Sequence, residues 1–267
     1  MGGRIVIKVG SNTLTNDQNE LDHYFIATLV DQIADLKKDG HEVVLVSSGA
    51  IAAGLDIIGL TGRPEDMPTL QACASIGQVA LVELYGAHFG RRGFCIGQVL
   101  LTKNDTEDKV AYAHARDTFE RLLELGSVPI VNENDTVAVE EIAFGDNDTL
   151  AALVAVMIEA DHVVILTDID GLYDRDPHRF PQAERLSMVG EITDAMLAVA
   201  GEAGSALGSG GMRTKLDAGK TLLEHGITMT LCDGRKANCV LDAVYGKSTG
   251  TVFDCTLMTG SYKQEKE

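Results

Sequence analysis

The sequence predicts an α/β protein, a three-layer α/β/α sandwich built on a mostly parallel central sheet. Short apolar runs typical of buried strands alternate with longer segments of helical periodicity along most of the chain. Glycine-containing or polar turns follow several of the strand runs. This alternation indicates parallel strands joined by crossover helices, which cover both faces of the sheet.

The expected strands are short apolar runs, at 5–9, 42–46, 94–101, 128–131, 162–166, 227–231 and 251–253. The expected helices carry apolar residues at three- and four-residue intervals, at 21–38, 51–60, 69–88, 110–125, 150–159, 193–200, 212–224 and 238–245. Asp22 and Gly40 mark the start and the end of the first helix. Turns or loops are expected at 61–68, 103–108 and 174–186, and a hairpin at 137–144.

No Pro/Ser-rich linker divides the chain, so we expect one domain over residues 1–257 followed by a polar tail at 258–267. Within that domain, two lobes that share the sheet are expected at about 1–160 and 161–257. A chain of 267 residues with 45% hydrophobic content can bury a large core.

Charge and cysteine content exclude several classes of protein. A net charge of −18 disfavours nucleic acid and anionic membranes as partners. No apolar run approaches the ~20 residues of a membrane helix, and Met1–Arg4 leads straight into the first strand, so no signal peptide is expected. The five cysteines are never spaced as CxxC, which indicates reduced thiols in a cytoplasmic protein.

Lys8 lies inside the first apolar run, two residues before Gly10. A lysine in a buried strand needs an anion within its reach, and main-chain N–H groups in a glycine turn can hold phosphate oxygens. The alternative is a strand lysine whose ammonium extends to solvent. A second turn of small residues, Ser47–Ala50, follows the second strand, and this repetition favours the anion site.

Glycines also lead into the helix expected at 212–224, in the segment Gly208–Lys215. Free N–H groups and the helix dipole at such a start favour an anion, and Lys215 lies about one turn into the helix. The segment is not a P-loop, because no Gly-Lys-Ser/Thr closes it, and no GxGxxG follows a strand. The alternative is a flexible loop before a surface helix.

Two polar clusters, Asn132–Asp135 and Asp146–Asp148, interrupt the alternation at strand ends, where ligands of open parallel sheets bind. Together they predict an acidic, hydrogen-bonding pocket suited to a ligand with a cationic amine. The alternatives are a helix N-cap for the second cluster and an ordinary polar loop for the first. The segment 168–176 is not a calcium loop, because its glycine is misplaced and Arg179 stands where a glutamate ligand belongs.

The motifs described above, taken in their order along the chain, resemble those of the amino-acid kinase family. The resemblance covers roughly residues 4–253. The motifs are Lys8–Ser11, Ser47–Ala50, Asn132–Asp135, Gly145–Asp148, Thr167–Asp168 with Gly171–Tyr173, and Gly208–Lys215. The combination of Asn-Glu-Asn-Asp with Gly-Asp-Asn-Asp resembles the motifs of those family members that phosphorylate the γ-carboxylate of L-glutamate. That reaction is the first step of proline biosynthesis. Many members carry a C-terminal domain of the PUA type, which we expect this chain to lack.

The resemblance implies the carbamate-kinase-like fold of the family, ATP and Mg²⁺ as cofactors, and L-glutamate as the acceptor. It implies that Lys8 and Lys215 flank the transferred phosphoryl group and that Asp148 holds the lysines in position. Glutamate binding is expected from Ser48, Gly49, Asn132, Asp135, Asp146 and Asn147, with Asp135 as the partner of the ammonium group. ATP binding is expected from Lys8, Gly10, Thr167, Asp168, Ser209, Gly210, Gly211, Met212, Arg213, Thr214 and Lys215. No dedicated protein site is expected for magnesium, because phosphates and water would hold most of the ion.

Other functions are also compatible with the sequence. A kinase of the same family could act on aspartate, N-acetylglutamate, carbamate or UMP, although the acidic pocket favours an acceptor with a free amine. A non-catalytic nucleotide or amino-acid sensor could share the fold, but it would not need both lysines and Asp148. The resemblance also implies feedback inhibition by L-proline and a homo-oligomer, a dimer or a tetramer.

Overall fold

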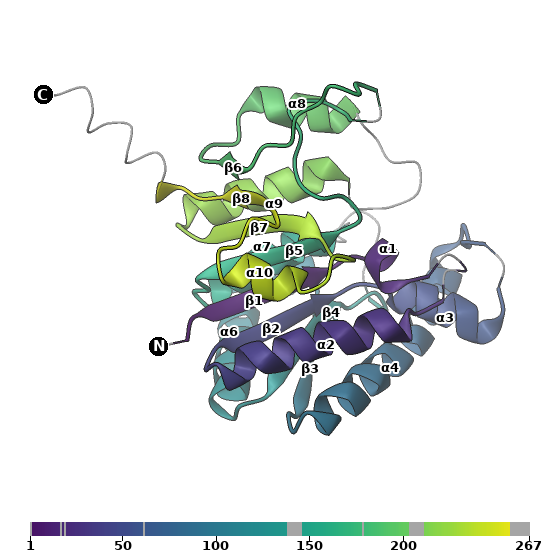
Figure 1. Cartoon of the computed structure of the whole chain (residues 1–267). Coiled ribbons are helices and arrows are strands. Elements are labelled where there is room, and N and C mark those ends of the chain that lie inside the picture. The colour runs from purple at the N-terminus through teal and green to yellow at the C-terminus, as the bar shows by residue number, and fades with distance from the viewer. Residues whose placement is uncertain are drawn as a thin grey trace, which may run out of the picture.

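The computed structural model describes residues 2–16, 18, 20–60, 62–137, 146–177, 179–202 and 211–256. Within these residues, eight strands form one sheet in the order β3-β4-β2-β1-β5-β7-β8-β6 (Figure 1). The strands are β1 (Arg4–Val9), β2 (Glu42–Ser47), β3 (Ile96–Leu101), β4 (Val128–Glu133), β5 (His162–Thr167), β6 (Met188–Val189), β7 (Thr228–Asp233) and β8 (Gly250–Phe253). All paired strands are parallel except β7 and β8, which confirms the mostly parallel sheet.

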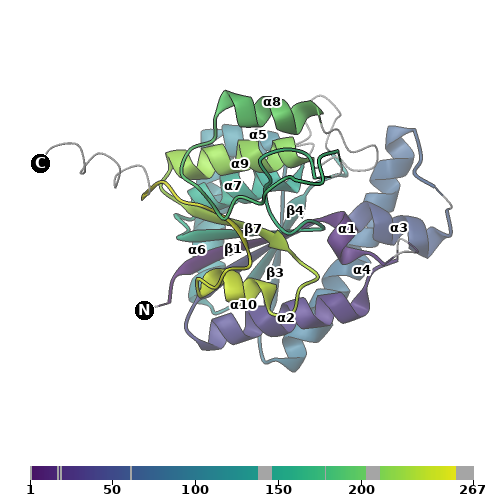
Figure 2. The ribbon, with the colours of Figure 1, turned by 45° about the horizontal axis from the view of Figure 1, so that its top comes forward.

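The helices are α1 (Ser11–Leu14), α2 (His23–Lys38), α3 (Ala50–Ile58), α4 (Met67–Arg91), α5 (Lys103–Glu107), α6 (Lys109–Glu124), α7 (Asn147–Met157), α8 (Asp194–Glu202), α9 (Met212–Glu224) and α10 (Cys239–Val244). Helices α2, α4 and α10 cover one face of the sheet, and α6, α7 and α9 cover the other (Figures 1 and 2). Each face has its own buried apolar cluster, so the three-layer α/β/α arrangement is confirmed. Among the described residues, no helix is both long and apolar enough to cross a membrane.

The structure differs from the sequence prediction mainly in short elements. The segment predicted as a turn at 103–108 forms α5, because Thr102 and Asp105 make a capping box, with the Asp105 carboxylate 2.7 Å from the Thr102 amide nitrogen. The turn after Gly10 winds into one helical turn, α1. Helix α7 begins at Asn147, three residues before the predicted start. The predicted hairpin lies almost wholly in 138–145, outside the described residues.

Helices α3 and α4 pack backbone to backbone, which positions α4 against the turn after β2. A Cβ atom on Gly77 would lie 1.8 Å from the Ala50 carbonyl oxygen, and one on Gly54 would lie 1.9 Å from the Cys73 carbonyl oxygen. Only glycine permits such an approach. Figure 2 shows the two helices side by side at one edge of the molecule. This packing brings the buried side chains of α4 beneath the small-residue turn Ser47–Ala50.

Candidate active site

The candidate site lies where four neighbouring strands end. Strands β4, β2, β1 and β5 are adjacent and parallel, so their carboxyl ends meet at one edge of the sheet. Side chains alternate between the faces along a strand, and Val6 packs into the cluster beneath α7 and α9. Lys8, two residues later, therefore points to the same face, where α7 and α9 begin.

Lys8 and Lys215 meet at a single carboxylate. Lys8 Nζ lies 2.6 Å from Asp148 Oδ1, and Lys215 Nζ lies 3.0 Å from Asp148 Oδ2. The exposed fractions are 4% for Lys8, 6% for Lys215 and 0% for Asp148. The alternative of a strand lysine extending to solvent is therefore wrong. Each lysine comes from a different half of the sheet, Lys8 from β1 and Lys215 from α9, which precedes β7.

The pKa values of the two aspartates in this cluster move in opposite directions. Burial by itself would raise the pKa of Asp148, but the charges of Lys8 and Lys215 outweigh it and hold that pKa well below its usual range. Burial and the neighbouring Asp148 charge raise the pKa of Asp146 to about 6, against the smaller effect of Lys8. Asp146 Oδ1 lies 3.9 Å from Lys8 Nζ, so it is the weaker partner of that lysine.

Asp146 occupies the N-cap position of α7, but its side chain makes no capping hydrogen bond. The helix-cap alternative is therefore correct about the position of Asp146 and wrong about a capping role for its side chain. Asp148, in the first turn, is engaged by the lysines and lies 3.1 Å from Thr214 Oγ1. Thr214 Oγ1 also lies 2.8 Å from the Gly211 carbonyl oxygen, which ties the start of α9 to Asp148.

Three of the residues predicted to bind glutamate, Ser48, Asn132 and Asn147, form a hydrogen-bond network beside this cluster. Asn147 Nδ2 donates to Ser48 Oγ at 2.8 Å and to Asn132 Oδ1 at 3.0 Å. Gly49 has a φ angle of +96°, a left-handed conformation that favours glycine, and it is the N-cap of α3 without a side-chain cap. Asp135 lies just beyond β4, where burial and the Glu133 charge raise its pKa to about 6.

The residues predicted to bind ATP are only partly brought together. Asn12 Nδ2 lies 3.4 Å from Asp168 Oδ2, and Thr167 Oγ1 donates to Asp168 Oδ1 at 3.1 Å. A Cβ atom on Gly10 would lie 3.6 Å from Lys8 Nζ, so this turn borders the lysine. Gly211 is the N-cap of α9 and has no side-chain cap.

Two other residues predicted to bind ATP direct their side chains away from the site. Two more of the predicted residues lie outside the described part of the chain. The Arg213 side chain turns along α9 to Asp217, with Nε 3.0 Å from Oδ2, and its Nη1 reaches the Leu197 carbonyl oxygen. Met212 packs against the apolar cluster. Ser209 and Gly210 belong to the undescribed segment 203–210.

With this geometry in place, comparison with known proteins identifies the family. A model of the amino acid kinase family matches residues 3–233. The chain belongs to the amino acid kinase family. The structure of UMP kinase from Ureaplasma parvum has the same fold, with a TM-score of 0.62 at 22% sequence identity, over 95% of this chain and 99% of that one.

Several curated relatives of this amino acid kinase carry the name glutamate 5-kinase. The protein from Geobacter metallireducens is 46% identical over 250 residues, which cover 94% of this chain and 67% of the relative. Glutamate 5-kinase 2 of Bacillus subtilis is 47% identical over 251 residues, 94% of this chain and 68% of the relative. The match to the Clostridium acetobutylicum protein, at 45% identity, covers 94% of both chains.

Sequence reasoning missed two polar side chains of α4 that support the site of this amino acid kinase. Gln78 Oε1 accepts a hydrogen bond from Asn132 Nδ2 at 2.9 Å. The Tyr85 hydroxyl, fully buried, lies 2.9 Å from Ser47 Oγ. The two residues are seven apart and so share the buried face of the helix. The only sequence signal is a polar residue on an otherwise apolar helix face.

The carboxylates of this amino acid kinase form no dedicated metal site within the part of the chain that the structure describes. Within the described residues, no group of three or more His, Cys, Asp or Glu side chains could hold a metal ion. The buried carboxylate of Asp148 is already neutralised by two ammonium groups. A cation bound between the phosphates of ATP needs few protein ligands, since water and phosphate oxygens supply most of its coordination.

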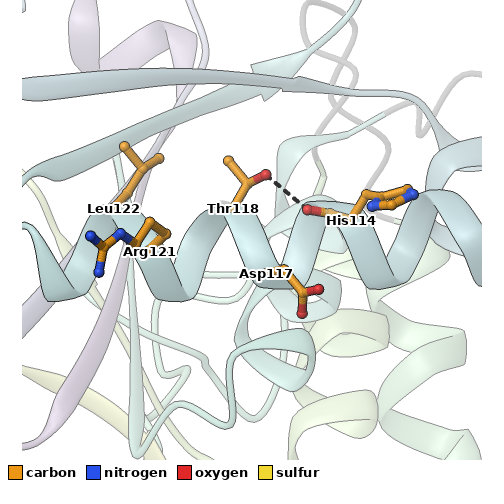
Figure 3. A pocket seen from close by; sticks show the side chains of 5 residues that line it. All are labelled: His114, Asp117, Thr118, Arg121 and Leu122. Atoms are coloured by element: carbon orange, nitrogen blue, oxygen red, sulfur yellow. Dashed lines mark hydrogen bonds between the residues drawn. The ribbon is translucent and has the colours of Figure 1, made fainter.

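A shallow hollow on the outer side of α6 is separate from this site. Its lining residues all belong to that helix: His114, Asp117, Thr118, Arg121 and Leu122 (Figure 3). Thr118 Oγ1 donates to the His114 carbonyl oxygen at 2.8 Å, a bond within the helix itself. None of these residues was predicted as a site residue, and the hollow has no part in the reaction proposed below.

Proposed function

We propose that this chain transfers the γ-phosphoryl group of ATP to the γ-carboxylate of L-glutamate and forms L-glutamyl 5-phosphate, the first step of proline biosynthesis. The observation that carries the proposal is that Lys8 and Lys215, distant in sequence, contact opposite oxygens of Asp148. Relatives at 45–47% identity named glutamate 5-kinase support glutamate as the acceptor.

The reaction needs charge neutralisation and alignment rather than a general base. A γ-carboxylate oxygen of glutamate attacks the γ-phosphorus of ATP, and the bond from that phosphorus to the β-phosphate bridging oxygen breaks, which releases ADP. The carboxylate is already ionised at neutral pH, so no proton has to be removed. Lys8 and Lys215 would stabilise negative charge on the transferred group, and Asp148 would keep both ammonium groups in place.

The acceptor would bind on the side of Ser48 and Asn147, with the carboxylate of Asp135 paired to the substrate ammonium. An acidic partner favours L-glutamate over N-acetylglutamate and UMP, which lack a free amine. The nucleotide would bind on the side of Thr167, Asp168 and the start of α9. Its magnesium would arrive with the phosphates.

The Michaelis constant for glutamate is expected to depend on pH through Asp135. Its raised pKa, about 6, means that the carboxylate is charged at pH 7 and largely protonated at pH 5. The ammonium of glutamate then loses its partner, so this constant should rise by about tenfold between pH 7 and pH 5. Steady-state kinetics at constant ionic strength measure this change.

The variant Asp135→Asn is the control for this pH dependence. It should have a high Michaelis constant for glutamate that rises less than that of the wild type over the same pH range, because only Asp146, which titrates in both proteins, can then contribute. A wild-type constant that is flat between pH 7 and pH 5 contradicts the role assigned to Asp135.

A panel of acceptors tests the proposed activity directly. Glutamate, aspartate, N-acetylglutamate, carbamate and UMP are each supplied with MgATP, and acyl phosphates are trapped with hydroxylamine. We expect ADP release and hydroxamate formation with L-glutamate. Turnover of aspartate without turnover of glutamate would reassign the acceptor, and ATP binding without turnover of any acceptor would indicate a sensor.

Three further properties remain predictions from the family resemblance. They are feedback inhibition by L-proline, assembly into a dimer or tetramer, and a cytoplasmic location. Addition of L-proline to the same assay tests the first, and sedimentation equilibrium tests the second.

A further inference from the structure

Gln78 lies behind the acceptor side of the site, on the buried face of α4. Its exposed fraction is 9%, and its Oε1 atom accepts from Asn132 Nδ2 at 2.9 Å. The close approach of Gly77 to the Ala50 carbonyl oxygen brings this part of α4 beneath the turn that carries Ser48. Gln78 therefore reaches the site from a helix that supplies none of the predicted site residues.

A chain of hydrogen bonds leads from Gln78 to the predicted glutamate ligands. Because Asn132 Nδ2 faces Gln78, its Oδ1 faces the other way and accepts from Asn147 Nδ2 at 3.0 Å. The amide hydrogen of Glu133 donates to the same Oδ1 at 2.9 Å. Asn147 Nδ2 in turn lies 2.8 Å from Ser48 Oγ. The orientation of one amide thus sets the positions of two further side chains.

Stability alone does not explain a glutamine at this position. Gln78 Nε2 is buried and has no hydrogen-bond partner among the described residues. A buried donor without a partner destabilises a protein, so most buried polar groups are paired. Two other buried atoms in the same state, Asp146 Oδ2 and Asn147 Oδ1, belong to the same site. Such concentrations of unpaired polar atoms are typical of functional sites rather than of cores.

We propose that Gln78 is a positioning residue for the amino-acid acceptor, which it serves by orienting Asn132 and, through it, Asn147 and Ser48. The inference rests on the proposed function, since its readout is the Michaelis constant for glutamate. Gln78 does not approach Lys8 or Lys215 in the hydrogen-bond network, so it acts on acceptor binding and leaves the phosphoryl-transfer step alone.

The variant Gln78→Met tests this role, because methionine has a similar length but no hydrogen-bonding amide. The Michaelis constant for glutamate should rise by roughly 3- to 10-fold, the effect of one lost hydrogen bond. The Michaelis constant for ATP and kcat should stay close to their wild-type values. The melting temperature should also change little, because the variant removes one unpaired buried donor, Gln78 Nε2, and leaves another, Asn132 Nδ2. Gln78→Leu is a second apolar variant from which the same split is expected.

The matched control is Gln32→Met in α2. Gln32 Oε1 accepts from the Val240 amide at 3.0 Å, away from the site. This variant should lower the melting temperature and leave the Michaelis constant for glutamate unchanged. If both glutamine variants change stability alone, Gln78 has only a structural role and the inference is rejected.

A double-mutant cycle tests whether Gln78 acts through Asn132. In an Asn132→Ala background, Gln78→Met should have little further effect on the Michaelis constant for glutamate, because the amide that it orients is gone. Additive effects would overturn the inference. A wild-type protein that does not phosphorylate glutamate would reject the proposed function itself, whereas an active wild type with an unchanged Gln78→Met variant would reject the role of Gln78.

Discussion

Replacement of Lys8 or Lys215 by alanine is expected to lower kcat for glutamate phosphorylation by about 10²–10³, the loss typical of one preorganised charge-stabilising group. Both ammonium groups lie at 2.6–3.0 Å from the oxygens of Asp148 and are almost fully buried. In that environment their charges are screened little, so each can stabilise developing charge on a transferred phosphoryl group. Steady-state kinetics at saturating MgATP and glutamate measure the loss.

Each lysine variant should remain folded, because the other lysine still neutralises Asp148. Thermal unfolding followed by circular dichroism provides this control. A matched exposed variant, Lys38→Ala, removes a lysine that pairs with Asp35 on the surface of α2 and should leave kcat unchanged. Near-normal turnover by folded Lys8→Ala or Lys215→Ala would refute the assigned role of that lysine.

Replacement of Asp148 by asparagine should affect stability and activity together. The substitution keeps the shape of the side chain but leaves two buried ammonium groups without their shared carboxylate, and Asp146 remains 3.9 Å from Lys8 Nζ. Loss of one partner from a buried ion pair typically lowers the free energy of unfolding by about 3–5 kcal/mol. We expect a loss of this order, together with a fall in kcat of at least about 10². Urea denaturation and steady-state kinetics measure the two effects.

The pH dependence of stability provides a further check on Asp148. Its pKa in the folded protein lies below the unfolded value, so its stabilising contribution is present above about pH 4 and is lost as the pH falls further.

The matched control for Asp148→Asn is Asp35→Asn, on the surface of α2, which should change the free energy of unfolding by less than about 0.5 kcal/mol. Equal effects of the two asparagine variants would contradict the buried role of Asp148.

Much of the fold follows from local patterns in the sequence. The predicted strand at 162–166 is β5 (His162–Thr167), and the predicted helix at 212–224 matches α9 (Met212–Glu224). These elements are predictable because their apolar periodicity is strong and their ends carry clear turn residues. α5 was missed because its five residues, Lys103–Glu107, are polar, and the helix depends on a capping box rather than on an apolar face.

The site was predictable to the extent that it is built from strand ends. Parallel strands bring their carboxyl ends to one edge, so Lys8, Ser48 and Asn132 meet although they are far apart in the sequence. The division of labour between Asp146 and Asp148 was predicted only through the family resemblance, which assigned the lysines to Asp148, because residue patterns alone do not show which carboxylate the lysines reach. Gln78 lies in the middle of a helix, and no local pattern indicates which polar groups its side chain meets.

Binding of a transition-state analogue tests most directly whether the two lysines act on the transferred phosphoryl group. MgADP with tetrafluoroaluminate and L-glutamate mimics the group in transfer, whereas a non-hydrolysable MgATP analogue mimics the ground state. Lys215→Ala should weaken binding of the transition-state analogue by about 10²-fold or more and binding of the ATP analogue by much less, because only interactions stronger in the transition state accelerate the reaction. Equal losses for both complexes would contradict this account, since Lys215 would then only hold the nucleotide.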